Sequence, residues 1–320
     1  MLCDECDVCI LPSVALHKCF IFVLILMQNG KTSTSGINFK LLARNLTIVE
    51  NDLAGSRELL KSLTFGKNTP IIGITGPPGA GKSTLVNSLI DLLLTDGSKI
   101  AVLAIDPTSP FNFGSLLGDR IRMASHFNHP DVFIRSLATR GSLGGLSAKT
   151  IEMADVLRAA GFDYVLIETV GVGQSEIEIA GLADVTMVVL VPEGGDEIQH
   201  IKSGLMEIAD AFIINKADRA DADLFANNLT KIIAQKNGEQ PPVFKTVASQ
   251  ANGIAEVATF IKSASMLPNT RRELLLTEKA YKLIQQNLTR HIDKKKLRYA
   301  VTEALNNKNF NLYSFVDTYV

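Results

Sequence analysis

The chain has 320 residues, a formal net charge of −1, 46% hydrophobic residues and 20% charged residues. These values describe a globular protein with a sizeable core, and they give no electrostatic reason to expect nucleic acid or an anionic membrane as the main partner. All four cysteines lie within the first 19 residues, so the rest of the chain has no disulfide framework and we expect a cytoplasmic protein.

The N-terminal segment differs in composition from the rest of the chain. Its cysteines are Cys3, Cys6, Cys9 and Cys19. The apolar run over 20–27 is too short to span a membrane, and the residues before it are acidic where a secretory signal would be basic. We expect residues 1–26 to be an upstream extension, with translation starting at Met27. A cysteine metal site and a membrane anchor are the alternatives.

The spacing of apolar residues divides the rest of the chain into three expected parts. Residues 27–69 form an N-terminal helical segment, in which leucines at helical spacing between 38 and 65 predict one or two amphipathic helices. Residues 70–266 alternate strand-like apolar runs with helical segments. This alternation predicts an α/β fold with a doubly wound, mostly parallel sheet that binds its ligand at the carboxyl ends of the strands.

The α/β region has seven expected strands and six expected helices. The strands are 70–75, 100–105, 132–135, 163–168, 185–191, 211–215 and 242–246. The helices are 83–95, 150–160, 175–182, 197–208, 221–236 and 253–264.

Residues 267–320 are expected to form a C-terminal helical arm. An apolar stripe runs along it beside several basic residues, and it consists of Leu276, Ala280, Leu283, Ile284, Leu288 and Ile292. A solvated basic helix and an arm that packs on a second subunit both fit this pattern.

A phosphate-binding loop is predicted between the first strand and the helix that follows. Residues 76–83 read Gly-Pro-Pro-Gly-Ala-Gly-Lys-Ser and fit G-x-x-x-x-G-K-[ST]. Backbone N–H groups and a helix N-terminus would surround a polyphosphate there. Lys82 would reach the β- and γ-phosphates, and the Ser83 hydroxyl would ligate Mg²⁺. The residues expected to hold the phosphates are Gly76, Pro77, Pro78, Gly79, Ala80, Gly81, Lys82, Ser83 and Thr84.

A second motif indicates the base. Asn215-Lys216-Ala217-Asp218 ends the expected strand 211–215 and fits the N-K-x-D pattern of GTPases. Asp218 can accept hydrogen bonds from the N1–H and the 2-amino group of guanine, and adenine offers neither. Lys216 would lie along the base, and Asn215 would brace the loop. The sequence therefore predicts GTP as the nucleotide.

Carboxylates near strand ends predict the magnesium site. Asp106 and Glu168 each follow an expected strand, and Asp119 lies in a glycine-containing loop between them. Mg²⁺ prefers oxygen ligands beside the phosphates, so we expect Asp106, Asp119 and Glu168 to hold it, or its water shell, together with Ser83. Ordinary capping of strand or helix ends is the alternative for each carboxylate.

The segment after Glu168 is the expected switch. Gly171 would offer its N–H to the γ-phosphate, and loss of that phosphate would release the segment. Gln174 is the candidate for the catalytic glutamine, beside Lys82 and Glu168 as the other catalytic residues, although Gln174 could also cap a helix. A site without a complete set of catalytic groups predicts slow turnover that a partner accelerates.

These strings occur in the order of the MeaB/ArgK family of P-loop GTPases, which the chain resembles over residues 38–310. Besides the two nucleotide motifs, the match includes Asp106-Pro107-Thr108-Ser109-Pro110 and the string from Glu168 to Glu176. The resemblance implies a GTP-hydrolysing chaperone that assists cofactor loading or protection of an adenosylcobalamin-dependent methylmalonyl-CoA mutase. It also implies Mg²⁺ with GTP, no organic cofactor of its own, and a homodimer formed through the C-terminal arm.

The resemblance assigns two more segments by position. Val247, Ala248 and Ser249 match a second guanine-contacting loop, where the family usually has Ser-Ala and this chain has Val-Ala, so a side-chain hydroxyl is missing. The segment 193–202 looks like a signalling loop toward the mutase, and its candidate residues are Asp196, Glu197 and Lys202.

Two other functions remain open at this point. An ATPase or kinase linked to arginine or ornithine transport would not need the N-K-x-D motif. A nickel-insertion metallochaperone GTPase would need metal ligands, and the five histidines show no ligand spacing.

Overall fold

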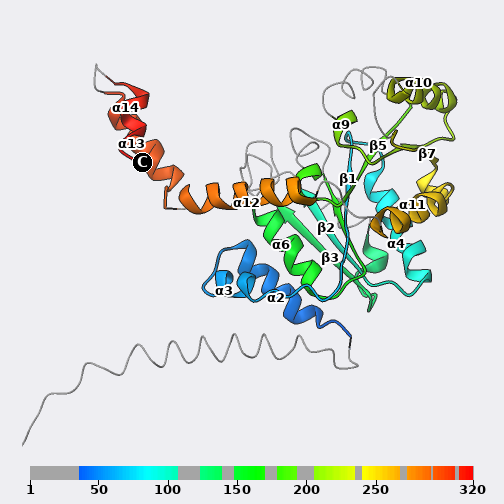
Figure 1. Cartoon of the computed structure of the whole chain (residues 1–320), viewed down its shortest axis with the longest axis horizontal. Helices are drawn as coiled ribbons and strands as arrows, with labels where there is room; N and C mark the ends of the chain where they lie inside the picture. The colour runs from blue at the N-terminus through cyan, green and yellow to red at the C-terminus, as the bar shows by residue number, and fades with distance from the viewer. Residues whose placement is uncertain are drawn as a thin grey trace, which may run out of the picture. The chain divides into compact units, whose positions relative to one another are not determined.

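A computed structural model describes residues 36–106, 123–138, 148–169, 179–192, 205–234, 240–266, 272–289, 291–306 and 310–319. The described residues up to Leu275 belong to one compact unit, and those from Leu276 onward belong to a second. Figure 1 shows the elements of both units.

The first unit contains a seven-stranded sheet in which every neighbouring pair of strands runs parallel. Its strands are β1 (Ile71–Thr75), β2 (Ile100–Asp106), β3 (Val132–Ala138), β4 (Tyr164–Glu168), β5 (Val185–Leu190), β6 (Ala211–Asn215) and β7 (Val243–Thr246). The order β3-β2-β4-β1-β5-β6-β7 places β1 in the middle, with β4 on one side and β5 on the other. The predicted fold class is confirmed. Ligands of such sheets bind near the carboxyl ends of the central strands.

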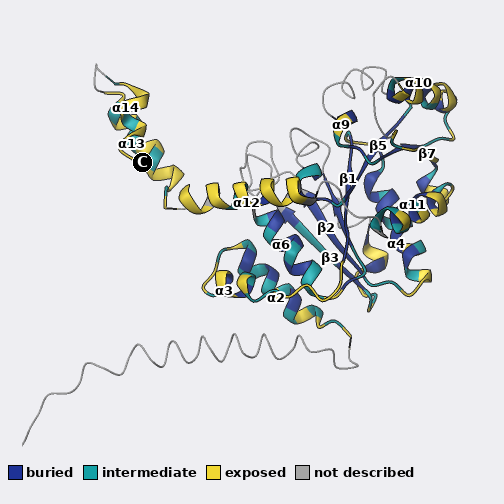
Figure 2. Ribbon diagram, viewed as in Figure 1, coloured by how far each residue is buried: buried dark blue, intermediate teal, exposed yellow. Residues whose placement is uncertain are grey.

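Helices cover both faces of this sheet, which explains why its central strands are almost continuously apolar. On one face, α4 (Lys82–Thr95) and α11 (Ile254–Met266) share a core with alternate residues of β1 and β5. On the other face, α2 (Phe39–Glu50), α3 (Ser56–Lys61) and α6 (Ala148–Ala159) pack over β2, β3 and β4. A third cluster joins α10 (Ala222–Ala234) to β5 and β6. Figure 2 shows the buried strands between these layers.

Most of the expected helices are present in the described residues. The sequence predicts one or two helices between 38 and 65, and the structure has two there: α2, which is capped by the Asn38 side chain, and α3. Two expectations fit less well. In the region expected to form helix 175–182, the described part is a 3₁₀ turn, η2 (Ile179–Gly181). In the region of helix 197–208, the described part holds only a short helix, α9 (Met206–Ile208). The earlier residues of both lie outside the described ranges.

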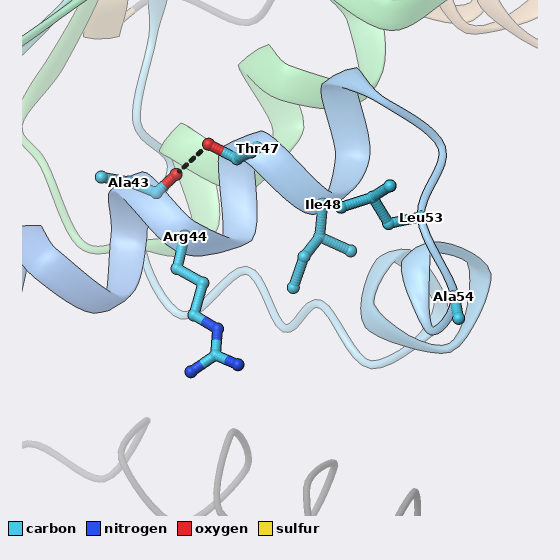
Figure 3. A pocket seen from close by; sticks show the side chains of 6 residues that line it. All are labelled: Ala43, Arg44, Thr47, Ile48, Leu53 and Ala54. Atoms are coloured by element: carbon cyan, nitrogen blue, oxygen red, sulfur yellow. Dashed lines mark hydrogen bonds between the residues drawn. The ribbon is translucent and has the colours of Figure 1, made fainter.

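The first described helix, α2, is joined to the edge strand β3 by a largely buried ion pair. The Arg135 guanidinium donates to the Glu50 carboxylate at 2.6 Å and to the Thr47 hydroxyl at 3.3 Å. The surface of α2 also borders a cavity of about 540 Å³ near the turn that follows the helix (Figure 3). The cavity is lined by Ala43, Arg44, Thr47, Ile48, Leu53 and Ala54.

The second unit contains most of α12 (Arg272–Thr289), together with α13 (Lys294–Ala304) and α14 (Leu312–Val316). Backbone N–H groups of Lys296 and Lys295 donate to the Asp293 side chain, which caps α13, and these bonds lower the pKa of that carboxyl. Many large apolar side chains of this unit are exposed. They are Leu276, Tyr281, Ile284, Leu288, Tyr299, Leu305, Leu312, Tyr313, Val316 and Tyr319.

Among the helices that the structure describes, none has both the length and the apolar character that a bilayer span requires.

Candidate functional site

The phosphate loop joins the end of β1 to the start of α4 and is closely packed on its neighbours. Gly76 and Gly81 have φ values of +137° and +85°, which residues other than glycine rarely adopt. A Cβ atom at Gly76 would collide with the carbonyl oxygen of Val189 in β5. A Cβ atom at Gly81 would collide with the side-chain amide of Asn215. The glycines therefore allow the loop to approach both β5 and the N-K-x-D segment.

Lys82 lies inside this loop. Its side-chain Nζ donates to the carbonyl oxygens of Gly76 and Pro77, both at 2.8 Å, and the residue is only 5% exposed. A buried ammonium group needs such acceptors, because its desolvation would otherwise be costly. The positive charge is thus held at the N-terminus of α4, whose dipole also favours an anion.

The structure brings together two of the predicted magnesium residues. The Ser83 hydroxyl, in the first turn of α4, donates to Glu168 Oε1 at 2.7 Å, and both residues are buried. Glu168 ends β4, beside β1, and the hydroxyl of the following Thr169 donates to that of Thr75 at 2.9 Å. A hydroxyl and a carboxylate next to a phosphate loop are hard oxygen donors of the kind that Mg²⁺ prefers. The residues present therefore fit this ion.

Asp106 is placed by its backbone alone. It is the last residue of β2 and pairs with Ala138, while Ala104 of the same strand pairs with Glu168 of β4. Asp106 therefore stands two residues beyond the level of Glu168, at the carboxyl edge of the sheet. Its side chain lies outside the described part, so its predicted role as a metal ligand stays a prediction.

Asn215 connects three segments that are distant in sequence. Its side-chain Nδ2 donates to the Ala80 carbonyl of the phosphate loop at 2.9 Å. Its Oδ1 accepts from the Thr246 hydroxyl at 3.2 Å and from the Ala248 N–H at 3.1 Å. The residue is buried, so these bonds leave little freedom for the N-K-x-D segment to move relative to the phosphate loop.

The rest of the N-K-x-D motif forms a tight turn after β6. Lys216 has a φ of +57°, which is uncommon for a residue with a side chain and is often found at functional turns. The Ala217 N–H donates to the Thr246 carbonyl at 3.0 Å, which fixes the turn to β7. Asp218 is exposed, so its carboxylate is accessible to a base.

The predicted second base loop, 247–249, follows β7 and is closed by pairing between Val247 and Asn252. Two hydroxyl groups that contact this region were missed by sequence reasoning. Thr246 precedes the loop and bonds to Asn215, and Ser88 of α4 donates to the Ala248 carbonyl at 2.7 Å. No pattern in the sequence connects Ser88 with residue 248, because the pairing exists only in the folded chain.

The other predicted site residues fall outside the described ranges, and their roles stay predictions. They are Asp119, Gly171, Gln174, Asp196, Glu197 and Lys202. Within the described ranges, no group of three or more histidine, cysteine, aspartate or glutamate residues is placed to hold a metal ion without a nucleotide.

A parallel sheet with a phosphate loop after its central strand and an N-K-x-D segment after β6 defines a P-loop GTPase domain. The sequence model of one family, described as methylmalonyl Co-A mutase-associated GTPase MeaB, matches residues 42–300, which is more than half of the chain. The chain belongs to the MeaB family, and it is a GTPase that hydrolyses GTP to GDP and phosphate.

Individual relatives agree with this assignment. A protein of Pyrococcus abyssi, named as a GTPase, is 49% identical over 254 residues, which are 77% of this chain and 78% of the relative. GTPase ArgK of Escherichia coli is 41% identical over 228 residues, 68% of this chain and 69% of the relative. The solved structure of a LAO/AO transport system kinase has a TM-score of 0.62, with 97% of this chain and 98% of that chain covered. At 24% identity it shows the fold alone.

Proposed function

We propose that this GTPase is a chaperone for an adenosylcobalamin-dependent methylmalonyl-CoA mutase and assists the loading or protection of the mutase cofactor. One observation carries the proposal: the match to a family described by its association with that mutase covers residues 42–300. The matched range includes the phosphate loop, the N-K-x-D segment and the loop after β7, so it spans the whole candidate site.

Within this proposal, the phosphate side of the site binds and orients the triphosphate. Lys82 exchanges its bonds to the Gly76 and Pro77 carbonyls for bonds to the β- and γ-phosphates. Ser83 and Glu168 hold Mg²⁺ or its water shell, with Asp106 and Asp119 as further candidates. When bound, Mg²⁺ supplies positive charge beside the phosphate oxygens.

The base side of the site selects guanine. Asn215 holds the N-K-x-D turn against the phosphate loop, and Asp218 accepts from the guanine edge. Lys216 lies along the base. The backbone of Val247, Ala248 and Ser249 closes the other side of the pocket, with the missing hydroxyl at position 247 leaving main-chain groups to make the contact.

Communication with the mutase is proposed to start from β5. At Gly76 the phosphate loop closely approaches the backbone of Val189 in β5. A shift of the loop would therefore displace this strand. The chain continues from β5 into the segment 193–202, which supplies the predicted signalling residues Asp196, Glu197 and Lys202. Gly171 and Gln174 belong to the predicted switch segment, which follows β4 in the chain, and β4 pairs with β1 on the side opposite to β5.

The proposal is tested by the rate of GTP turnover with and without an adenosylcobalamin-dependent methylmalonyl-CoA mutase. We expect the mutase to raise the rate by about tenfold or more, as partners do for incomplete GTPase sites. Lys202→Ala should reduce this stimulation while basal hydrolysis stays near that of the parent. Lys245→Ala removes an exposed lysine that is paired with Asp223 and should leave both rates unchanged. An unchanged rate with mutase would contradict the chaperone proposal.

The exposed apolar residues of the second unit support a homodimer. Exposed apolar side chains that share one helix face commonly mark contact with another protein, and the residues concerned include Leu276, Ile284 and Leu288 of the predicted stripe. Burial of this stripe on a second copy of the chain is the form of association that we propose.

The two alternatives have weaker support. The likeness to the transport system kinase, at 24% identity, shows the fold alone and gives no support to a transport role, and at the edge that guanine would present ATP offers no donor to the Asp218 carboxylate. A nickel-insertion GTPase would depend on Cys3, Cys6 and Cys9, which lie outside the described residues.

A further inference from the structure

The Ser88 side chain makes a hydrogen bond to a residue that is distant in the sequence. It lies on α4, the helix that begins at the phosphate loop, and its hydroxyl oxygen is 2.7 Å from the Ala248 carbonyl oxygen. The carbonyl of Thr84, one turn earlier in the same helix, is 3.1 Å away. A hydroxyl has one proton, so the shorter contact, to a residue 160 positions later in the chain, is the stronger hydrogen bond.

The Ala248 residue is thereby held from two sides. Its N–H donates to Asn215 Oδ1 at 3.1 Å, and its carbonyl accepts from Ser88. The residue is buried, so both polar groups depend on protein partners, and the carbonyl also accepts from the Ala251 N–H at 3.2 Å within the 3₁₀ turn. Asn215 belongs to the base motif, and Ser88 belongs to the helix that follows the phosphate loop.

The Val247 side chain cannot replace Ser88 in holding the base loop on α4. Val247 has no polar side-chain atom, and its N–H is already bonded to the Asn252 carbonyl at 3.0 Å. The preceding Thr246 uses its hydroxyl on Asn215. Among the hydrogen bonds of the described residues, the bond from Ser88 ties the base loop directly to α4.

We propose that Ser88 is a positioning residue for guanine-nucleotide binding, which holds the 247–249 loop at the base pocket by fixing the Ala248 carbonyl to α4. The inference rests on the proposed role of this loop in contacting guanine. A loop that is fixed before binding costs less conformational entropy when the nucleotide enters. The Ser88 hydroxyl therefore controls nucleotide affinity and release, while the hydrolytic step depends on the phosphate side.

The test is Ser88→Ala, with release rates and dissociation constants measured using fluorescent GDP and GTP analogues. We expect release of both nucleotides to be about tenfold faster, since the buried Ala248 carbonyl loses the shorter of its two hydrogen bonds and the loop loses its bond to α4. The single-turnover hydrolysis rate of the fully loaded protein should change by less than about twofold, which a general loss of structure would not allow. Ser88→Thr keeps a hydroxyl at this position and should restore slow release.

Two further variants separate positioning from helix stability. Thr259→Ala removes an exposed hydroxyl of α11 that bonds only to the Ala255 carbonyl of its own helix, and it should leave release unchanged. Thr246→Val removes the neighbouring bond to Asn215, so its effect combined with Ser88→Ala should be smaller than the product of the single effects. Residues that act on the same loop couple in this way.

The inference is wrong if Ser88→Ala releases nucleotide at the parent rate, if Thr259→Ala speeds release equally, or if hydrolysis in the loaded Ser88→Ala protein falls as much as affinity. These outcomes differ from failure of the proposed function. If the parent binds guanine nucleotides tightly but does not respond to a mutase, the partner proposal fails and the role of Ser88 can still be measured.

Discussion

The Lys82→Ala variant is expected to hydrolyse GTP about a hundredfold more slowly than the parent, or not measurably. The charge that it removes lies within the phosphate loop, where the carbonyls of Gly76 and Pro77 hold it at 2.8 Å. Catalysis of phosphoryl transfer is mostly positioning and charge stabilisation, so the loss of this ammonium group affects the transition state directly. The measurement is the rate of phosphate release at saturating GTP and Mg²⁺.

A matched control separates this effect from the loss of a positive charge anywhere in the protein. Lys262 of α11 is ion-paired with Asp96 and lies outside the site, and Lys262→Ala should retain the parent rate. Parent-like turnover in Lys82→Ala would show that the loop does not hold the reacting phosphates.

The Asp218→Asn variant is expected to bind GTP about a hundredfold more weakly and to accept xanthosine triphosphate in its place. The carboxylate can accept from both N1–H and the 2-amino group of guanine. An amide at the same position offers an N–H that suits the 2-carbonyl of xanthine instead. The turn that carries Asp218 is fixed to β7 by the Ala217 N–H, so the backbone should stay in place. Calorimetric titration with each nucleotide measures the exchange of specificity.

Asp221→Asn provides the control for this change. Asp221 is also exposed and stands three residues further on, just before α10, where asparagine can replace aspartate at a helix N-terminus. This variant should keep the parent preference for GTP. If Asp218→Asn kept it as well, the N-K-x-D turn would not be at the base.

The sheet could be predicted because its central strands are buried on both faces. β1, β5 and β6 are almost continuously apolar, and their limits agree with the predicted ones to within one residue. β3 was predicted to end at residue 135 and continues to Ala138. The polar residues Arg135 and Ser136 interrupt its apolar pattern, and the sequence does not reveal that Arg135 is paired with Glu50 of α2.

For the candidate site, the sequence predicts residue types and leaves the contacts between them open. The motifs name the residue types at the phosphate loop and the base turn, because their chemistry requires particular side chains at fixed spacing. They do not show how these segments are joined. The bonds of Asn215 to the Ala80 carbonyl and of Ser88 to the Ala248 carbonyl cross more than a hundred residues of sequence, and they depend on the order of strands in the folded sheet.

The most direct test of the account is a calorimetric titration of the parent protein with GTP and with ATP, both in the presence of Mg²⁺. The phosphate loop treats the two nucleotides alike, so any preference reports the base side of the site, where Asp218 stands on the turn that Asn215 holds against Ala80. The account predicts that GTP binds at least about a hundredfold more tightly than ATP. Equal affinities would contradict the assignment of this site to guanine.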